Sequence, residues 1–366
     1  MRKCLVIVAV IIAIVAGFMC FKKYNVEDDS EKTTIKIGVT LPLTGDVAYV
    51  GKSVQKALEL SLRDLKKEKS LKYDYELLFE DDGLDYKTAV TNYQRFVNMY
   101  DVKALFSVWT NSSVISSKNN EKVVHMGCSW GYETAEGLYN FNHSTLPKEQ
   151  IDTLIRELKK HNVKTMGILH NPIRADEKIV TLLKEELDRN GIEVVFVNSF
   201  NVDQKDFRIS IIKMKEQPVD MVFVLLLDPG MEVYMKQAKE LGYNPQYTTF
   251  DYFSYNPSLF EGFWYVRDAV GGKEFVDYFV KETGEDVQAC VSNFYDALQI
   301  VINAFESSPS EDESIPNLDD VVGAILKSDD LGRATGRSYI DDEGNIHATP
   351  TVEIIKDGAS VLSPRL

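Results

Sequence analysis

The stretch from Ile35 to Leu65 constrains the fold most, because it has the pattern of a strand, a turn and a long helix. Aliphatic and β-branched residues crowd together over Ile35–Leu43, as they do in a strand that is covered on both faces of a sheet. Gly45 and Gly51 bracket the following turn, where the backbone can approach a small molecule closely. From Val50 onward, apolar residues recur at helical spacing. A unit of this kind typically begins one half of a ligand-binding cleft.

The same alternation of strand and helix continues along the chain and then restarts after His143. It indicates parallel sheets with right-handed crossovers. One open sheet of so many strands would be uncommon, and 366 residues are enough for two lobes of ordinary domain size. The sequence therefore predicts an α/β fold of two doubly wound, parallel-sheet lobes. The strand patterns after the first are Tyr75–Gly83, Val102–Trp109, Val123–Cys128, Thr165–Asn171, Glu193–Phe200, Met221–Asp228, Gln246–Tyr252 and Pro350–Lys356.

Several blocks resemble one family. The run from Ile37 to Ser53 resembles the opening of the branched-chain amino-acid-type (Leu/Ile/Val-binding-like) periplasmic solute-binding proteins of ABC importers. Four more blocks follow in the same order: Glu80–Asp82 with Lys87–Val90, Asn111–Ser113, Lys236–Gly242 and Asp341–Asn345. The resemblance covers the chain from Ile35 to its end and implies the type I periplasmic-binding-protein fold with a three-segment hinge. It implies a first lobe of residues 35–144 and 270–332 and a second of residues 145–269 and 333–366.

Residues 1–34 predict a signal peptide or membrane anchor followed by a polar spacer. Arg2 and Lys3 precede an almost unbroken apolar run over Leu5–Phe21. Three outcomes stay open: cleavage after a small-residue pattern such as Val15–Gly17, retention as an anchor, or lipidation at Cys20. Each of them predicts an extracytoplasmic protein, in the periplasm or at the outer face of the cell membrane. It would be either exported by the signal peptide or held at the membrane by the N-terminal anchor.

Charge and cysteine content limit the partners and the cross-links. The formal net charge of −15, without a basic block, argues against nucleic acid as a partner. Cys128 and Cys290 are the two cysteines outside the N-terminal segment. We expect them to be small buried residues, although a single bridge between them stays open.

The loops that follow strands are the expected ligand contacts of the first lobe. The segment Trp109–Ser113 places hydroxyls and backbone N–H groups at a helix N-terminus, which favours a carboxylate, although a plain helix cap is the alternative. The resemblance implies that Asn111 contacts the ligand carboxylate, where a serine or threonine is commoner. It also implies contacts after the fourth strand, where Trp130 replaces a small residue and could stack on the solute or pack at the lobe rim. The predicted contacts are Tyr49, Trp109, Asn111, Ser112, Ser113, Cys128, Ser129 and Trp130.

In the second lobe, the predicted contacts are Leu227, Asp251 and Tyr252. The resemblance implies that Asp251 pairs with the ligand ammonium, whereas a solvated turn aspartate is the alternative. Two positions that are often aromatic in amino-acid binders are Ala175 and Leu227 here. We therefore expect a roomier or more apolar cleft than in a typical relative.

Enzyme motifs are missing from the sequence. It has no glycine-rich phosphate loop, no paired-histidine metal spacing and no nucleophile elbow, so we expect neither an enzyme nor a bound cofactor or metal. The acidic run Glu80–Asp82 is more typical of a solvated turn than of a cation site.

The resemblance implies a solute-binding protein. It would capture a small molecule, expected to be an amino acid or related amide, between its lobes and deliver it to the permease of an ABC importer. The alternative is a receptor subunit whose cleft signals to a membrane partner, and an uncleaved N-terminal anchor would favour it.

Overall fold

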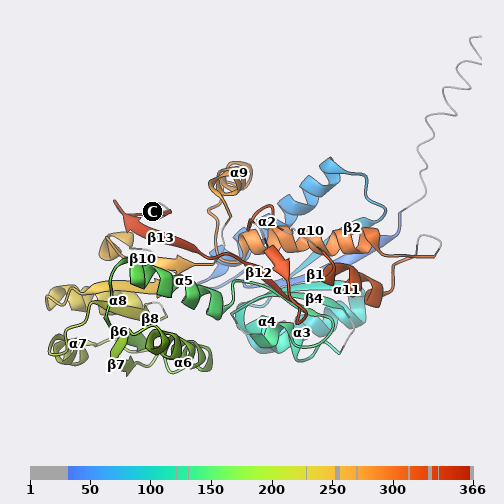
Figure 1. The fold of residues 1–366 in the computed structure, drawn as a ribbon. Coiled ribbons are helices and arrows are strands. Elements are labelled where there is room, and N and C mark those ends of the chain that lie inside the picture. The colour runs from blue at the N-terminus through green and yellow to red at the C-terminus, as the bar shows by residue number, and fades with distance from the viewer. Residues whose placement is uncertain are drawn as a thin grey trace, which may run out of the picture.

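The computed structural model describes residues 32–120, 123–130, 132–227, 229–251, 256–268, 271–311, 314–328, 332–336 and 338–362. They form two α/β lobes side by side, each around a seven-stranded sheet (Figure 1). Both sheets are mainly parallel, so the expected fold class is confirmed. The expected signal peptide or anchor falls largely on residues 1–31, which lie outside the described residues. Among the described residues, no helix is long and apolar enough to cross a membrane.

The first lobe surrounds the sheet with strand order β11-β12-β5-β4-β3-β1-β2, in which the β11–β12 pair is antiparallel. Its strands are β1 (Thr34–Leu41), β2 (Asp74–Asp81), β3 (Ala104–Val108), β4 (Val124–Cys128), β5 (Asn140–His143), β11 (Ser338–Ile340) and β12 (Asn345–Ala348). Its helices are α2 (Ala48–Glu68), α3 (Tyr86–Arg95), η1 (Phe96–Tyr100), α4 (Trp109–Ser116), η2 (Tyr132–Ala135), α9 (Lys273–Thr283), α10 (Val291–Ser307) and α11 (Leu318–Leu326).

The second lobe surrounds the sheet with strand order β14-β13-β10-β9-β8-β6-β7, in which β13 runs antiparallel to both of its neighbours. Its strands are β6 (Thr165–His170), β7 (Glu193–Ser199), β8 (Met221–Leu225), β9 (Gln246–Phe250), β10 (Trp264–Arg267), β13 (Thr351–Lys356) and β14 (Ala359–Leu362). Its helices are α5 (Pro147–Lys160), α6 (Arg174–Arg189), α7 (Arg208–Lys215), α8 (Gly230–Glu240) and η3 (Pro257–Phe260).

Helices cover both faces of each sheet, which explains the continuous apolar runs in the strands. In β8, Val222 and Val224 join one apolar cluster while Phe223 joins the cluster on the opposite face. In β3, Phe106 and Leu105 are divided between two clusters in the same way. Neighbouring residues of a strand point to opposite faces, so both faces need apolar side chains.

Gly51 is required by a close approach of the chain to itself. It lies in the first turn of α2, and a Cβ atom there would stand 2.1 Å from the carbonyl oxygen of Pro42. Any larger residue would push α2 away from the end of β1. The glycine that we associated with a nearby ligand thus serves the packing of the strand–helix unit.

The chain crosses between the lobes three times, from β5 to α5, from β10 to α9 and from β12 to β13. The sheets differ from the expected lobe boundaries at the last crossing. We expected residues 333–366 to complete the second lobe, but β11 and β12 extend the first sheet, because β12 pairs in parallel with β5 through Ile346 and His143. The second sheet receives β13 and β14.

Candidate functional site

The first turns of α4, which follows β3 directly, are held mainly by bonds within the first lobe. Trp109 begins α4 with a φ angle of +54° and packs partly buried against the core. Ser112 is fully buried, and its hydroxyl donates to the carbonyl oxygen of Ser107 at 2.6 Å. Ser113 Oγ lies 3.0 Å from Thr134 Oγ1 at the next loop. The Ser112 hydroxyl is therefore engaged in the fold, and Ser113 is the more accessible of the two.

Asn111 is fully buried, and neither atom of its amide group makes a hydrogen bond of normal geometry. The amide lies close to Asp82, whose pKa is raised by burial and lowered in part by Asn111. Asp82 Oδ2 accepts from the Thr40 hydroxyl at 3.0 Å. Asn111 thus lies against the buried carboxyl group of Asp82, and its amide retains unused hydrogen-bonding capacity.

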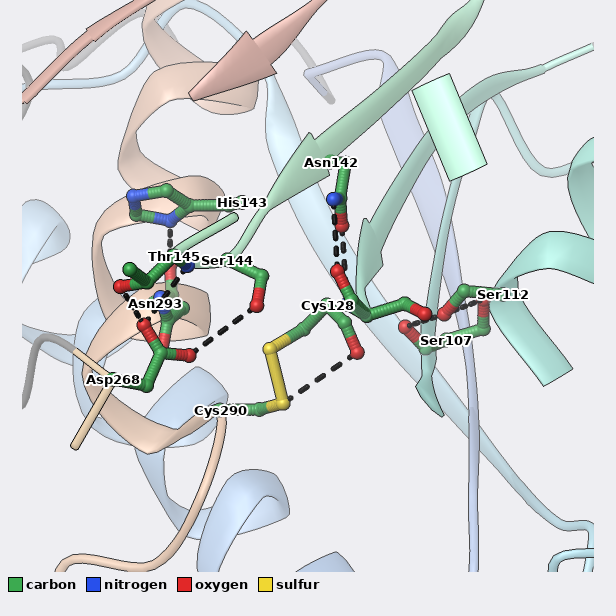
Figure 2. Close-up of a disulfide and its surroundings, with 11 residues drawn as sticks. Ser107, Ser112, Cys128, Asn142, His143, Ser144, Thr145, Asp268, Cys290 and Asn293 are labelled. Atoms are coloured by element: carbon green, nitrogen blue, oxygen red, sulfur yellow. Dashed lines mark hydrogen bonds between the residues drawn. A yellow bond between two sulfur atoms is a disulfide. The ribbon is translucent and has the colours of Figure 1, made fainter. Parts of the chain in front are cut away.

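The loop after β4 is fixed by a disulfide between Cys128 and Cys290 (Figure 2). Our expectation of two unlinked buried cysteines is wrong. The bridge joins the end of β4 to the residue that precedes α10, across 162 residues of sequence. Sequence separation says nothing about this proximity, which arises because α10 returns to the first lobe after the second crossing. Cys128 is 1% exposed and its sulfur is bonded, so it offers no thiol to a ligand.

A buried amide clamps the next residue of this loop. Asn142 Oδ1 accepts from the backbone N–H of Ser129 at 3.0 Å, and Asn142 Nδ2 donates to the Ser129 carbonyl oxygen at 2.9 Å. Trp130 follows, and its half-buried side chain packs against the apolar cluster of the second lobe that includes Phe250 and Trp264. Trp130 therefore spans the two lobes from an anchored loop.

Asp251 follows β9 and is buried, at 8% exposure, with a φ angle of +41°. Its Oδ2 accepts from Gln150 Nε2 at 2.8 Å, and its Oδ1 accepts from the backbone N–H of Asp268 at 2.8 Å. Burial raises the pKa of Asp251 to about 7, and the Asp268 carboxylate acts in the same direction. The carboxyl group is thus poised between its two protonation states near neutral pH, where a cation would favour the charged form.

Asp268 ties two of the crossings together beside Asp251. Its Oδ1 accepts from the backbone N–H of Thr145 at 2.9 Å, and its Oδ2 accepts from Ser144 Oγ at 3.3 Å (Figure 2). His143 Nδ1 lies 2.6 Å from the Asn293 carbonyl oxygen, and burial lowers the pKa of His143 to about 4, so the ring is neutral. The first and second crossings therefore share one polar network.

The remaining predicted contacts are Tyr49, Leu227 and Tyr252. Tyr49 is half-buried at the start of α2 against the first-lobe core. Leu227 is 49% exposed, and its backbone N–H donates to Asn171 Oδ1 at 2.7 Å. Tyr252 lies outside the described residues. Among the described residues, no group of three or more His, Cys, Asp or Glu is arranged to hold a metal ion.

The acidic run at the end of β2 anchors the loop that follows β1. Asp81 Oδ1 accepts from the backbone N–H of Leu43 at 2.8 Å, and Asp81 Oδ2 accepts from Thr44 Oγ1 at 2.6 Å. Burial opposes ionisation of Asp81, but hydrogen bonds from Thr44, Gly83 and Leu43 outweigh it and lower its pKa. The run is thus not a plain solvated turn, because Asp81 is held by hydrogen bonds.

Reasoning from the sequence missed Asn142, Gln150 and Asp268. Asn142 alternates with apolar Phe141 in a strand whose four residues are all buried. A polar side chain in a buried strand needs a partner, and that signal could have singled out Asn142. Nothing in the sequence pairs Gln150 with Asp251, because these residues meet only after the second lobe has folded.

Two parallel-dominated sheets, linked by three crossings and carrying polar loops after their strands, define the class of hinged, two-lobed binding proteins. A family model described as periplasmic binding protein matches residues 34–325. The chain belongs to the periplasmic binding protein family. The family consists of solute-binding proteins rather than enzymes, and its location is extracytoplasmic.

Relatives of known sequence are distant. A "Leu/Ile/Val-binding protein homolog 8" of Brucella abortus is 21% identical over 226 residues, which is 58% of this chain and 56% of that protein. The chain thus spans a little over half the length of the first curated relatives it matches. A "Leu/Ile/Val-binding protein homolog 3" of Brucella melitensis is 23% identical over 88% of this chain and 91% of its own length.

Solved structures share the fold at low identity. A leucine-binding protein from Thermotoga maritima superposes with a TM-score of 0.76 at 19% identity, over 90% of this chain and 97% of that one. A branched-chain amino acid binding protein from Streptococcus pneumoniae in complex with isoleucine superposes with a TM-score of 0.76 at 17% identity. The match covers 90% of this chain and 98% of that one. A solute-binding protein from R. palustris in complex with benzoate superposes with a TM-score of 0.76 at 14% identity. The match covers 90% of this chain and 95% of that one.

Proposed function

We propose that this protein captures an amino acid or a related amide between its two lobes and delivers it to an ABC importer. The observation that supports this most is the pair of anchored loops on opposite lobes, one carrying Trp130 and the other Asp251. Trp130 would cover the apolar part of the ligand, and Asp251 would pair with its ammonium group. The names of the relatives, which include a binding protein for leucine, isoleucine, valine, threonine and alanine, support this ligand class.

The first-lobe contacts of the proposed site are the N-terminal turn of α4 and the loop after β4. Asn111 has a buried amide with unused hydrogen-bonding capacity, and Ser113, two residues further along α4, is only partly buried. Both lie where the α4 backbone N–H groups favour a carboxylate. The Ser112 hydroxyl already donates to the carbonyl oxygen of Ser107, so Ser112 would stabilise the start of α4 rather than contact the ligand.

Closure would follow from differential contacts. A ligand that touches both lobes stabilises the arrangement in which they are close, and the three crossings supply the hinge. We propose in addition that the N-terminal segment exports the protein and keeps it at the membrane surface, because Leu5–Phe21 is an apolar run behind two basic residues.

Thermal unfolding with a panel of amino acids and amides tests the proposed ligand class. A ligand that binds only the folded chain must raise its melting temperature. We expect one member of the panel to do so, and Asp251→Ala and Asn111→Ala each to weaken its binding while the protein stays folded. If no member changes the melting temperature, the ligand class is wrong; if neither variant changes the affinity, the site is misplaced.

A further inference from the structure

A cavity of about 420 Å³ lies beside the hinge, where α5 of the second lobe meets β11 and β12 of the first. This volume is within the range of small-molecule sites. None of the predicted cleft contacts contributes to its walls. The residues that line it are Glu149, Asp152, Thr153, Arg156, Ser338, Tyr339, His347, Ala348, Thr349 and Pro350.

The carboxylates in its wall already have cationic partners. Glu149 Oε1 lies 2.7 Å from His347 Nδ1, and Asp341, which does not line the cavity, places its Oδ2 2.8 Å from His347 Nε2. Asp152 pairs with Lys148 at 2.6 Å. Because both ring nitrogens of His347 face carboxylates, these contacts favour the doubly protonated, positively charged ring. The acids of the wall are therefore not free to attract a cationic ligand.

Arg156 is the cation of the wall that remains without an acidic partner among the described residues. Its Nη2 donates to a neutral group, the hydroxyl of Thr153, at 2.8 Å. Ser338 lines the same cavity, is 3% exposed, and its hydroxyl has no hydrogen-bond partner within the described part of the chain. A guanidinium and an unused buried hydroxyl together suit a carboxylate.

One side of the cavity is flat and apolar. The Tyr339 ring stacks on the His347 ring, with centroids 4.5 Å apart and an angle of 9° between the planes, yet Tyr339 remains 61% exposed. An aromatic face that is held rigidly on one side and open on the other can stack on a planar ligand. Pro350 adds an apolar neighbour.

We propose that this cavity is an accessory site for a small planar carboxylate, separate from the cleft that binds the transported solute. The carboxylate contacts Arg156 and Ser338, and the flat body lies against Tyr339. Because the walls come from both lobes, the occupant contacts both and favours one relative orientation of the lobes.

Isothermal titration of the purified full chain with benzoate, a ring with one carboxylate, tests the proposal. Benzamide lacks the charge, sulfate lacks the ring, and benzylamine reverses the charge. We expect benzoate to bind, with at least a ten-fold weaker affinity in Arg156→Gln and in Tyr339→Ala. Arg189→Gln is the matched control, because Arg189 pairs with Glu186 on α6 and does not line the cavity. Its benzoate affinity should equal that of the unaltered chain.

Trp130→Ala separates the two sites. This variant should leave the affinity for benzoate unchanged, while it weakens the binding of the amino acid that the thermal-unfolding panel identifies. Failure to bind benzoate, equal binding of benzamide, sulfate or benzylamine, or loss of benzoate binding in Trp130→Ala but not in Arg156→Gln would each overturn the accessory site. None of these results bears on the panel of amino acids, so the proposed function stands or falls separately.

Discussion

Asn142 is the residue whose removal should loosen the Trp130 loop most directly. Asn142→Ala deletes two buried hydrogen bonds to the backbone of Ser129. We expect the free energy of unfolding to fall by about 1–3 kcal/mol. Chemical denaturation measures it, and Asn303→Ala, at an exposed position of α10, is the control that should change little. An unchanged stability in Asn142→Ala would show that the loop does not depend on this clamp.

The protonation of Asp251 should make ligand binding depend on pH. Burial and Asp268 raise its pKa to about 7. Below that pH the carboxyl must lose a proton before it pairs with an ammonium, so the affinity should rise with pH by up to about ten-fold per unit and level off above about pH 7. Titration of the amino acid from the panel at several pH values measures this. An affinity independent of pH in this range would remove Asp251 from the site.

His347 should stabilise the fold in a pH-dependent way. The Glu149 hydrogen bond outweighs the opposing effect of burial, and Asp341 acts with it, so the pKa of His347 is raised. A raised pKa means that its stabilisation is complete below the unfolded-state value of about 6.5 and is lost as the pH rises through the folded value. The difference in unfolding free energy between the unaltered chain and His347→Gln should therefore shrink with rising pH. A difference for His347→Gln that is constant from about pH 5 to 9 would contradict the assigned charge of His347.

At the scale of single residues, the sequence predicts which loops carry the polar groups but not which groups remain free. Ser112 and Asn111 are neighbours in the first turn of α4. The Ser112 hydroxyl donates to the carbonyl oxygen of Ser107, whereas the Asn111 amide makes no hydrogen bond of normal geometry. That difference depends on where β3 and β4 place their neighbours, which local patterns do not encode.

Among the elements, the connection between β4 and α10 should be the strongest single link in the first lobe. The Cys128–Cys290 bridge closes a loop of 162 residues. Replacing both cysteines by serine should lower the unfolding free energy by about 2–4 kcal/mol. Denaturation with and without reductant measures this, and reductant should have no further effect on the double variant. If both cysteines of the unreduced protein react with an alkylating agent, the bridge is absent.

Element types were predictable wherever the periodicity was long. The strand expected over residues 165–171 matches β6 to within one residue at each end. The four-residue strand β10 was missed because its burial, not its pattern, defines it. The block Asp341–Asn345 was recognisable from the family resemblance, but the sheet that its strands join depends on pairing with β5, a long-range contact.

The whole molecule depends on two lobes whose loops meet at one gap. Trp130 of the first lobe packs against an apolar cluster of the second lobe, and the Asp268 network joins two of the crossings. Such an arrangement can change its opening by rotation at the crossings without disturbing either sheet. Closure of the lobes around a solute thus requires that a bound ligand changes the separation of the lobes and not their internal structure.

Small-angle X-ray scattering of the purified chain, with and without the amino acid identified by thermal unfolding, measures this most directly. We predict that the ligand lowers the radius of gyration while circular dichroism stays unchanged, and that Trp130→Ala reduces the change. A radius of gyration that is identical with and without a saturating ligand would contradict closure of the lobes around the solute.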